Sequence, residues 1–438
     1  MIALVLSLAF AAPEASALND FLHGADQANV DRRLSREQVR RAALEFRQAW
    51  MALLPSLTAS AGWTHNQYPA EFSPTAGIQQ FVDLIPPGFI DPARLTALQN
   101  QPPTVIMPKN QLDAALRFEL PIIDPGRWLR AAGASLVSDG TEVRDELTAD
   151  NVRRAVINAY YGYLAALAVR DSAKKTQAVA EAQLKLVEAR VSVGSGTELE
   201  LLRSKAEAQR AKQTIADTEA VVATSARALE TLSGRTPAAA IAMPESDLSA
   251  EPPVEELEKS IDKLPALRAA SVDLRTSERA LLASRLAILP TINFQFTERF
   301  TNATGFQNQS TLYNLGFNLV WRLDVPVFQG MVVQGAAVSL AELQAEKSRL
   351  AARDQVNADW QRLNAALTKV QAARAQAEAA QRAAQVARDR YAVGATTQLE
   401  LIQTDRDMFA AEVGEIQAKT ELALARASLR ISTARPVD

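Results

Sequence analysis

Two glutamates, Glu200 and Glu400, occupy the same place in a stretch that the chain contains twice. The stretch from Val193 to Leu202 reappears from Val393 to Ile402, at a constant offset of 200 residues. A threonine precedes each glutamate by three residues, which is the spacing of a capping box, in which the two side chains bind free backbone N–H groups at a helix start. The chemistry indicated is hydrogen bonding and negative charge at the first turn of two helices.

The elements that position these glutamates are two helical hairpins. Each copy follows one long run rich in Ala, Gln and Arg and precedes another. Gly194 and Gly394 are predicted to end the incoming helices, because glycine accepts the left-handed conformation that a helix C-terminus often requires. Each copy therefore predicts a hairpin tip, and the duplication predicts two similar halves in one molecule.

Other reactive groups are scarce. The 438 residues contain no cysteine, so we expect no disulfide, no thiolate chemistry and no lipid attached through an N-terminal cysteine. The two histidines, His23 and His65, have no neighbouring ligand-like residues, and no nucleophile–base pair, phosphate-binding loop or metal-ligand spacing occurs. We therefore expect neither an enzyme nor a cofactor or metal site. A net charge of -3 gives no reason to expect nucleic-acid binding.

The N-terminus has the form of an export signal. An apolar run from Ile2 to Ala12 is too short to span a bilayer, and Ala15-Ser16-Ala17 fits the small-residue cleavage pattern, although no Lys or Arg precedes the run. We predict a signal peptide over 1–17, a first structural repeat over 18–234, a connector over 235–264 and a second repeat over 265–438.

Each repeat is predicted to contain a helix, two strands and a long hairpin. In the first repeat a helix from Ser35 to Leu54, capped by Ser35, precedes alternating strands at 57–63 and 116–120, separated by a long proline-rich loop at 68–110. The hairpin arms then run from Arg127 to the tip and from Thr197 to Leu232. The second repeat follows the same plan, with a helix at 265–289, strands at 292–296 and 315–325 that Pro326 and Gly330 close, and arms from there to Gly394 and from 397 to 432. A short helix is expected near 254–264 in the connector.

The predicted hairpin arms are longer than the core of a globular domain is deep. A continuous helix from Gly126 to Gly194 would be about 100 Å long at 1.5 Å per residue. From Val356 to Tyr391, apolar residues recur at steps of four and three, as in a heptad seam, and alanine occupies most of the part nearest the tip. This pattern fits helices packed side by side around a tunnel, and it fits a plain antiparallel coiled coil equally well.

The strands favour a membrane barrel. Four amphipathic strands of roughly ten residues match the length of tilted barrel strands. Four strands cannot close a barrel, so several chains would have to share one. The alternative is a small soluble four-stranded sheet. Five aromatic residues are candidates either for lipid or interface contact or for packing within the sheet: Trp63, Phe294, Phe296, Phe317 and Trp321.

These features resemble the TolC-like outer membrane efflux proteins over nearly the whole chain after the signal. The most specific element is the duplicated tip, at 391–402 and more loosely at 191–202, and the segments 54–57, 289–292 and 324–328 are also similar to that family. The resemblance implies a mainly α fold with a membrane β-barrel contribution, in which a homotrimer shares one twelve-stranded barrel in the outer membrane of a Gram-negative cell and a helical tunnel in the periplasm. It also implies a channel for efflux or type I secretion that binds outer membrane lipid, a periplasmic adaptor and, through the adaptor, an inner-membrane pump or ABC transporter.

The resemblance also assigns site residues. Glu200, Glu400 and Gln403 would lie around the pore aperture, where like charges would attract cations. The tips that contact the adaptor would contain Gly194, Ser195, Gly196, Gly394, Ala395 and Thr396. Capping is the alternative role for both glutamates, and plain turn chemistry is the alternative for the tips. An exported coiled-coil scaffold, or a periplasmic adaptor without a barrel, is the alternative function.

Overall fold

The computed structural model describes residues 13–73, 86, 91–100, 102–239 and 241–436. Its elements form two compact units. The first unit comprises Met1–Ala42, Leu136–Arg275 and Ser339–Asp438, and the second comprises Ala43–Ser135 and Thr276–Val338. Among the described residues, no helix combines the length and the apolar character needed to cross a bilayer.

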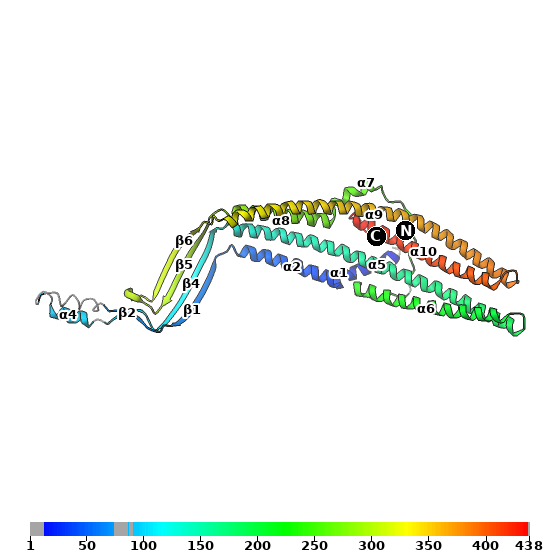
Figure 1. The fold of residues 1–438 in the computed structure, drawn as a ribbon, viewed down its shortest axis with the longest axis horizontal. Helices are drawn as coiled ribbons and strands as arrows, with labels where there is room; N and C mark the ends of the chain where they lie inside the picture. The colour runs from blue at the N-terminus through cyan, green and yellow to red at the C-terminus, as the bar shows by residue number, and fades with distance from the viewer. Residues whose placement is uncertain (1–12, 74–85, 87–90, 101, 240, 437–438) are drawn as a thin grey trace, which may run out of the picture. The chain divides into compact units, whose positions relative to one another are not determined.

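The four longest helices are the predicted hairpin arms. Helix α5 spans Pro125–Ser192 and helix α9 spans Val325–Ala392, and each has 68 residues. The return arms are α6, Glu198–Ser233, and α10, Gln398–Ser432. Figure 1 shows α5 beside α6 and α9 beside α10, joined by tight turns. The predicted arms and both tips are therefore confirmed.

The α9 seam packs with the predicted heptad period. Six buried residues recur every seven positions along this helix: Val356, Leu363, Val370, Ala377, Ala384 and Tyr391. The residues that alternate with them, such as Trp360 and Leu367, are half-buried. The core that these residues form with α10 includes Leu422 and Leu429. Toward the tip, most of the buried seam residues are alanines, and their small side chains permit close approach of neighbouring helices.

The connector is fixed to the second hairpin. Helix α7, Val254–Leu257, and the 3-10 helix η1, Glu258–Lys263, agree with the short helix expected there. Leu257 and Ile261 are buried in the same core as Val356. The connector also carries Asp247 and Ser249, whose carbonyl oxygens accept hydrogen bonds from the buried Arg426 of α10 at 2.9 and 2.7 Å.

Two N-terminal helices precede the sheet. Helix α1 spans Pro13–Ala28 and α2 spans Val30–Met51. Residues 1–12 of the predicted signal lie outside the described residues, whereas 13–17 begin α1. From Leu18 onward, α1 belongs to the core: Leu18 and Phe21 are buried among Tyr160 and Leu164 of α5 and Leu229 of α6.

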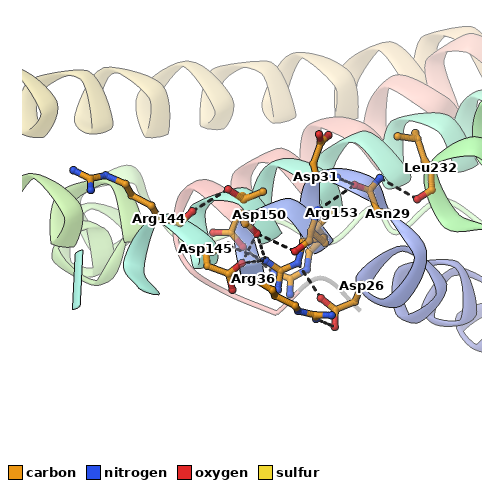
Figure 2. Close-up of polar contacts among 12 residues, drawn as sticks. Asp26, Asn29, Asp31, Arg36, Arg144, Asp145, Asp150, Arg153 and Leu232 are labelled. Atoms are coloured by element: carbon orange, nitrogen blue, oxygen red, sulfur yellow. Dashed lines mark hydrogen bonds and ion pairs between the residues drawn. The ribbon is translucent and has the colours of Figure 1, made fainter. Parts of the chain in front are cut away.

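The expectation that Ser35 caps the N-terminal helix is wrong. The cap is Asn29, whose side-chain oxygen accepts from the N–H of Asp31 at 2.9 Å and whose side-chain nitrogen donates to the carbonyl of Leu232 at 3.1 Å (Figure 2). Ser35 lies inside α2, is buried, and donates to Asp145 of α5. The Ser35 hydroxyl therefore forms a contact between two helices, although the residues after it have the local pattern of a helix start.

A buried arginine joins α2 to α5. Arg32 is 7% exposed and pairs with Asp145 at 2.6 Å and with Asp26 at 3.0 Å. Figure 2 shows Asp26 and Asp145, the two carboxylates that pair with Arg32. Arg36 forms a second ion pair with Asp26. Burial raises the pKa of Asp26, but the hydrogen bonds from Arg32 and Arg36 outweigh it and leave the pKa below its ordinary value.

The second unit contains a four-stranded antiparallel sheet with the order β1-β4-β5-β6 (Figure 1). The strands are β1, Ser56–His65; β4, Asn110–Ile123; β5, Thr291–Thr301; and β6, Thr311–Val320. Helix α8, Pro265–Leu286, precedes β5, and a 3-10 turn η2, Gly305–Gln307, lies between β5 and β6. The pairing of β4 with β5 joins the two strands that precede the first hairpin to the two that precede the second, in one sheet.

The long loop expected at 68–110 contains further elements. Strands β2, Ala70–Phe72, and β3, Thr104–Met107, pair antiparallel, and helix α4, Pro92–Gln99, lies between them in sequence. These elements are too short to show a hydrophobic period in the sequence. The surrounding prolines, which are typical of loops, also favoured a loop prediction. Residues 74–85, 87–90 and 101 of the expected loop lie outside the described residues.

The predicted end of the last strand is also wrong. Strand β6 ends at Val320, and α9 begins at Val325 although apolar alternation continues to that residue. Asp324 caps the helix, because its side chain and its carbonyl both accept from the N–H of Val327 at 3.2 Å. Pro326 is compatible with the first turn, where its missing N–H costs nothing. Asp124 starts α5 in the same way, accepting from Arg127 at 2.9 Å.

Candidate functional site

The two hairpin tips have the same backbone geometry. Gly194 and Gly394 have φ angles of 72° and 77°, in the left-handed region. The N–H of each glycine donates to the carbonyl three residues earlier, at 3.0 and 3.1 Å. The next residue, Ser195 or Ala395, donates to the carbonyl five residues earlier, at 2.9 and 2.8 Å. This pair of bonds is a Schellman motif, and it explains why the repeat preserves a glycine at this position.

The two glutamates differ in what they bind. Glu200 completes a capping box, since its carboxylate accepts from the N–H of Thr197 at 2.9 Å and its own N–H donates to the Thr197 hydroxyl at 3.2 Å. Glu400 donates its N–H to Thr397 at 3.3 Å, but its carboxylate accepts from the hydroxyl of Thr396. The reciprocal cap predicted for both copies is therefore complete only in the first, and the Glu400 carboxylate is more exposed.

The tip surfaces are open to a partner. Gly194, Ser195, Gly394 and Ala395 are exposed, whereas Gly196 and Thr396 are half-buried. Beside them Val193 and Val393 are 78% and 80% exposed. Gln403 is also exposed, one turn beyond the tip on α10. The turn geometry depends on the glycines and does not require an exposed apolar residue such as valine at either tip.

A glutamine links the two hairpins just beyond the tips. The side-chain nitrogen of Gln398 donates to the carbonyl of Glu200 at 2.8 Å and to the hydroxyl of Ser204 at 2.6 Å. Both Gln398 and Ser204 are 3% exposed. In addition, the Arg190 guanidinium of the first hairpin lies over the Tyr391 ring of the second, 5.2 Å from its centroid.

Ion pairs continue this contact along the helices. Arg406 of α10 pairs with Glu207 of α6, with an Nε–Oε1 distance of 3.1 Å, and these hydrogen bonds raise the pKa of Arg406. Within the second hairpin, Arg388 binds Asp405 through Nε at 3.0 Å and Nη2 at 2.7 Å. Burial raises the pKa of Asp405, although Arg388 opposes that shift. The two hairpins are thus held together by hydrogen bonds and charge near their tips.

Sequence reasoning missed most of this contact between the hairpins. Gln398, Ser204, Glu207 and Arg406 carry no motif of their own. One signal was present, because the repeated stretch has Gln398 where the first copy has Glu198. Among the positions at which the two copies differ, this one replaces a charged residue by a neutral amide, as suits the buried contact that only the second copy makes.

The sheet has one apolar and one polar face. The register aligns an apolar row across the four strands, formed by Leu57, Phe118, Phe296 and Leu315. The adjacent row is polar and consists of Thr58, Arg117, Thr297 and Asn314. Because neighbouring residues of a strand point to opposite faces, these rows lie on opposite sides of the sheet. Much of the apolar face is exposed, with Phe317 at 70% and Leu315 at 59%.

The two outer strands have open edges. Strands β1 and β6 end the order of the sheet, and within the described part of the chain neither pairs on its outer side. Three of the five aromatic residues singled out from the sequence are exposed, namely Trp63, Phe317 and Trp321, whereas Phe294 and Phe296 are half-buried. Open strand edges and an exposed apolar face both call for further protein or lipid contact.

Comparison with known proteins agrees with this geometry. The family model of outer membrane efflux proteins matches residues 94–235 and 257–435. No match was found among curated protein sequences.

Solved structures share the fold. The Campylobacter jejuni CmeC outer membrane channel is similar with a TM-score of 0.77 and 14% identity, over 95% of this chain and 85% of that one. A membrane protein from Pseudomonas aeruginosa gives a TM-score of 0.76 and 18% identity, over 95% and 93% of the two chains. The Neisseria gonorrhoeae MtrE outer membrane channel, in its open state, gives a TM-score of 0.73 and 15% identity, over 96% and 90% of the two chains. The hairpins, the sheet and the family match together show that this chain belongs to the outer membrane efflux protein family.

Proposed function

We propose that the protein is the outer membrane channel-tunnel of a tripartite efflux or type I secretion system. Substrates would pass from a periplasmic adaptor and an inner-membrane pump or ABC transporter, through the helical part in the periplasm, to the outside of the cell. The observation that carries the proposal is a sheet with one exposed apolar face and two open edges, in a chain of the outer membrane efflux protein family.

The barrel is proposed to be shared by three copies. Open edges are not viable in lipid, so β1 of one chain must pair with β6 of the next until the sheet closes. Four strands from each of three copies give an even number well above the eight that enclose packed side chains. The apolar row containing Phe118 and Phe296 would then face lipid, and the row containing Arg117 and Thr297 would face the lumen.

The tips are proposed to bind the adaptor. Val193 and Val393 present apolar side chains at the ends of two rigid hairpins. The flanking Gly194–Gly196 and Gly394–Thr396 turns provide exposed backbone for hydrogen bonds. Two similar tips in one chain would give an adaptor two similar contacts for each protomer.

Glu200, Glu400 and Gln403 are proposed to surround the pore aperture. In a symmetric trimer each position would occur three times around the axis, and rings of carboxylates favour cations. Glu400, which is exposed and accepts from the Thr396 hydroxyl, suits this role better than Glu200, which is half-buried and engaged in a complete capping box. The contacts of Gln398 and Arg406 beside them would hold the aperture closed.

The chain is proposed to contain two structural repeats, at 18–234 and 265–438, joined by the connector at 235–264 and preceded by a cleaved signal at 1–17. The recurring order of helix, strand, strand and hairpin supports this division.

Fractionation tests the proposed function. The chain should be expressed in a Gram-negative cell that lacks its own exporters of this family, and the inner and outer membranes should then be separated on a density gradient. We expect the protein in the outer membrane, as an oligomer that dissociates only on heating. Recovery of the folded protein from the soluble periplasmic fraction would instead support a coiled-coil scaffold or an adaptor.

A further inference from the structure

A cavity of about 300 Å³ lies between the two hairpins, farther from the tips than the Gln398 contact. It is lined by residues of α5, α6, α9 and α10, all within the first unit. Its volume is at the lower limit of pockets that hold small organic molecules. Glu200, Glu400, Gln403 and the tip residues do not line this cavity, whereas Arg406, which binds Glu207 across the hairpins, does.

Most of the wall is apolar. The side chains that give it this character come from both hairpins: Val179, Ala180, Ala211, Ile402, Met408 and Phe409. Phe409 supplies an aromatic ring, and Met408 is flexible enough to adapt to the shape of a guest. The wall therefore suits a compact apolar body such as a fused ring or a short hydrocarbon chain.

Four charged residues of the wall neutralise one another. Arg388 binds Asp405 in the second hairpin, and Arg406 binds Glu207 across the hairpins. Asp405 is half-buried, so this part of the wall is partly shielded from solvent, and the burial raises the pKa of its carboxyl group. These pairs leave no charge over for a ligand.

Two hydrogen-bond donors of the wall lack an acceptor. The side-chain nitrogen of Gln183 is buried and has no hydrogen-bond partner. Arg210 lines the same cavity from an exposed position on α6, and no described residue forms an ion pair with its guanidinium. A buried donor without an acceptor is unfavourable, and a third arginine gives the charged wall an excess of one positive charge. The Gln183 nitrogen and the Arg210 guanidinium are therefore both free to donate to an anionic ligand, because the two carboxylates of the wall are already paired.

We propose that this cavity is a binding site for a small apolar carboxylate. The hydrocarbon part would lie against Val179, Met408 and Phe409, and the carboxylate would accept hydrogen bonds from Gln183 and Arg210. A neutral molecule of the same shape would leave Arg210 without a counter-charge. An amphipathic amine would meet the excess positive charge and would leave the Gln183 nitrogen without an acceptor.

Such a ligand would connect the hairpins. It would contact α5 and α6 of the first hairpin and α10 of the second at the same time, so binding would favour the arrangement in which the hairpins lie together. Binding itself does not rest on the proposed channel function. Only the effect of the ligand on channel opening rests on that function, and binding and opening can be measured separately.

Calorimetric titration of the full-length protein, purified in amphipol, tests the binding. The probes are 2-naphthoate, 2-naphthalenemethanol and 2-naphthylmethylammonium, which share a ring system and differ in charge. We expect saturable binding of 2-naphthoate, at least tenfold tighter than that of the alcohol, and the weakest binding for the amine. Equal affinity for the three probes, or no saturable binding of 2-naphthoate, would overturn the proposal.

Variants locate the site. Arg210→Gln should weaken 2-naphthoate binding about tenfold and leave the alcohol unchanged, since a hydrogen bond to a charged group is lost. Arg203→Gln, on the exposed part of α6 outside the cavity, is the matched control and should bind like the wild type. Ala180→Trp should fill the cavity and abolish binding. Gln183→Leu gives a second test if that variant fails to assemble, and wild-type affinity in both Arg210→Gln and Gln183→Leu would refute the site.

Discussion

Substituting Gln398 by methionine should loosen the hairpins near their tips. The side-chain nitrogen of Gln398 donates to the Glu200 carbonyl at 2.8 Å and to the Ser204 hydroxyl at 2.6 Å, and the residue is almost fully buried. Methionine keeps a similar volume, so the substitution removes the hydrogen bonds without leaving a cavity. The change therefore isolates the polar link between the hairpins.

The size of the effect follows from the two bonds. Each neutral hydrogen bond contributes about 0.5–1.5 kcal/mol net, so losing both costs about 1–3 kcal/mol in each protomer. If opening separates the hairpins, the opening equilibrium should rise about 5- to 150-fold for each protomer. Because all three protomers of a trimer would carry the substitution, the shift of the opening equilibrium should be large.

Single-channel conductance in planar bilayers measures this equilibrium. Gln398→Met should raise the open fraction, while native mass measurement shows that the oligomer is intact. Gln209→Met, at an exposed position of α6, is the matched control and should behave like the wild type. An unchanged open fraction in Gln398→Met, or the same rise in both variants, would refute the view that Gln398 holds the hairpins together.

Three further predictions test the barrel, the aperture and the tips. Phe317→Lys, on the apolar face of the sheet, should reduce barrel stability by about 2–4 kcal/mol when measured by urea unfolding in lipid, whereas Asn318→Lys on the opposite face should have little effect; equal costs would contradict the assignment of faces. The double variant Glu200→Gln, Glu400→Gln should reduce cation preference in bilayer recordings with nearly unchanged trimer melting, and unchanged selectivity would assign both residues to capping alone. Gly394→Val forces a β-branched residue into a left-handed turn, so export should fail while oligomer yield is kept if the tip binds an adaptor; normal export would count against both the turn and the docking roles.

Local chemistry made the tips predictable. Glycine at a positive φ and threonine before a helix act within a few residues, so Gly194, Gly394 and Thr197 could be assigned from sequence alone. The buried side of α9 could also be predicted, because its buried residues recur every seven positions. The same locality explains the success of the family resemblance, which depends on the duplicated tip.

Contacts between distant residues could not be predicted in this way. Gln398 and Ser204 are 194 positions apart, and neither belongs to a recognisable motif. Ser35 had the local pattern of a cap, but its hydroxyl binds Asp145, which no local rule anticipates. At Val325 the alternating pattern continued past the strand, and capping by Asp324 decided where the helix begins.

The central claim is that several copies of this chain close one barrel, and the mass of the assembled protein tests it most directly. Native mass spectrometry of the full chain, released from detergent, should give three copies, because the open edges of β1 and β6 require partners. Circular dichroism of the same sample should show that its strands are intact. A homogeneous monomer that retains its full strand content would contradict the account.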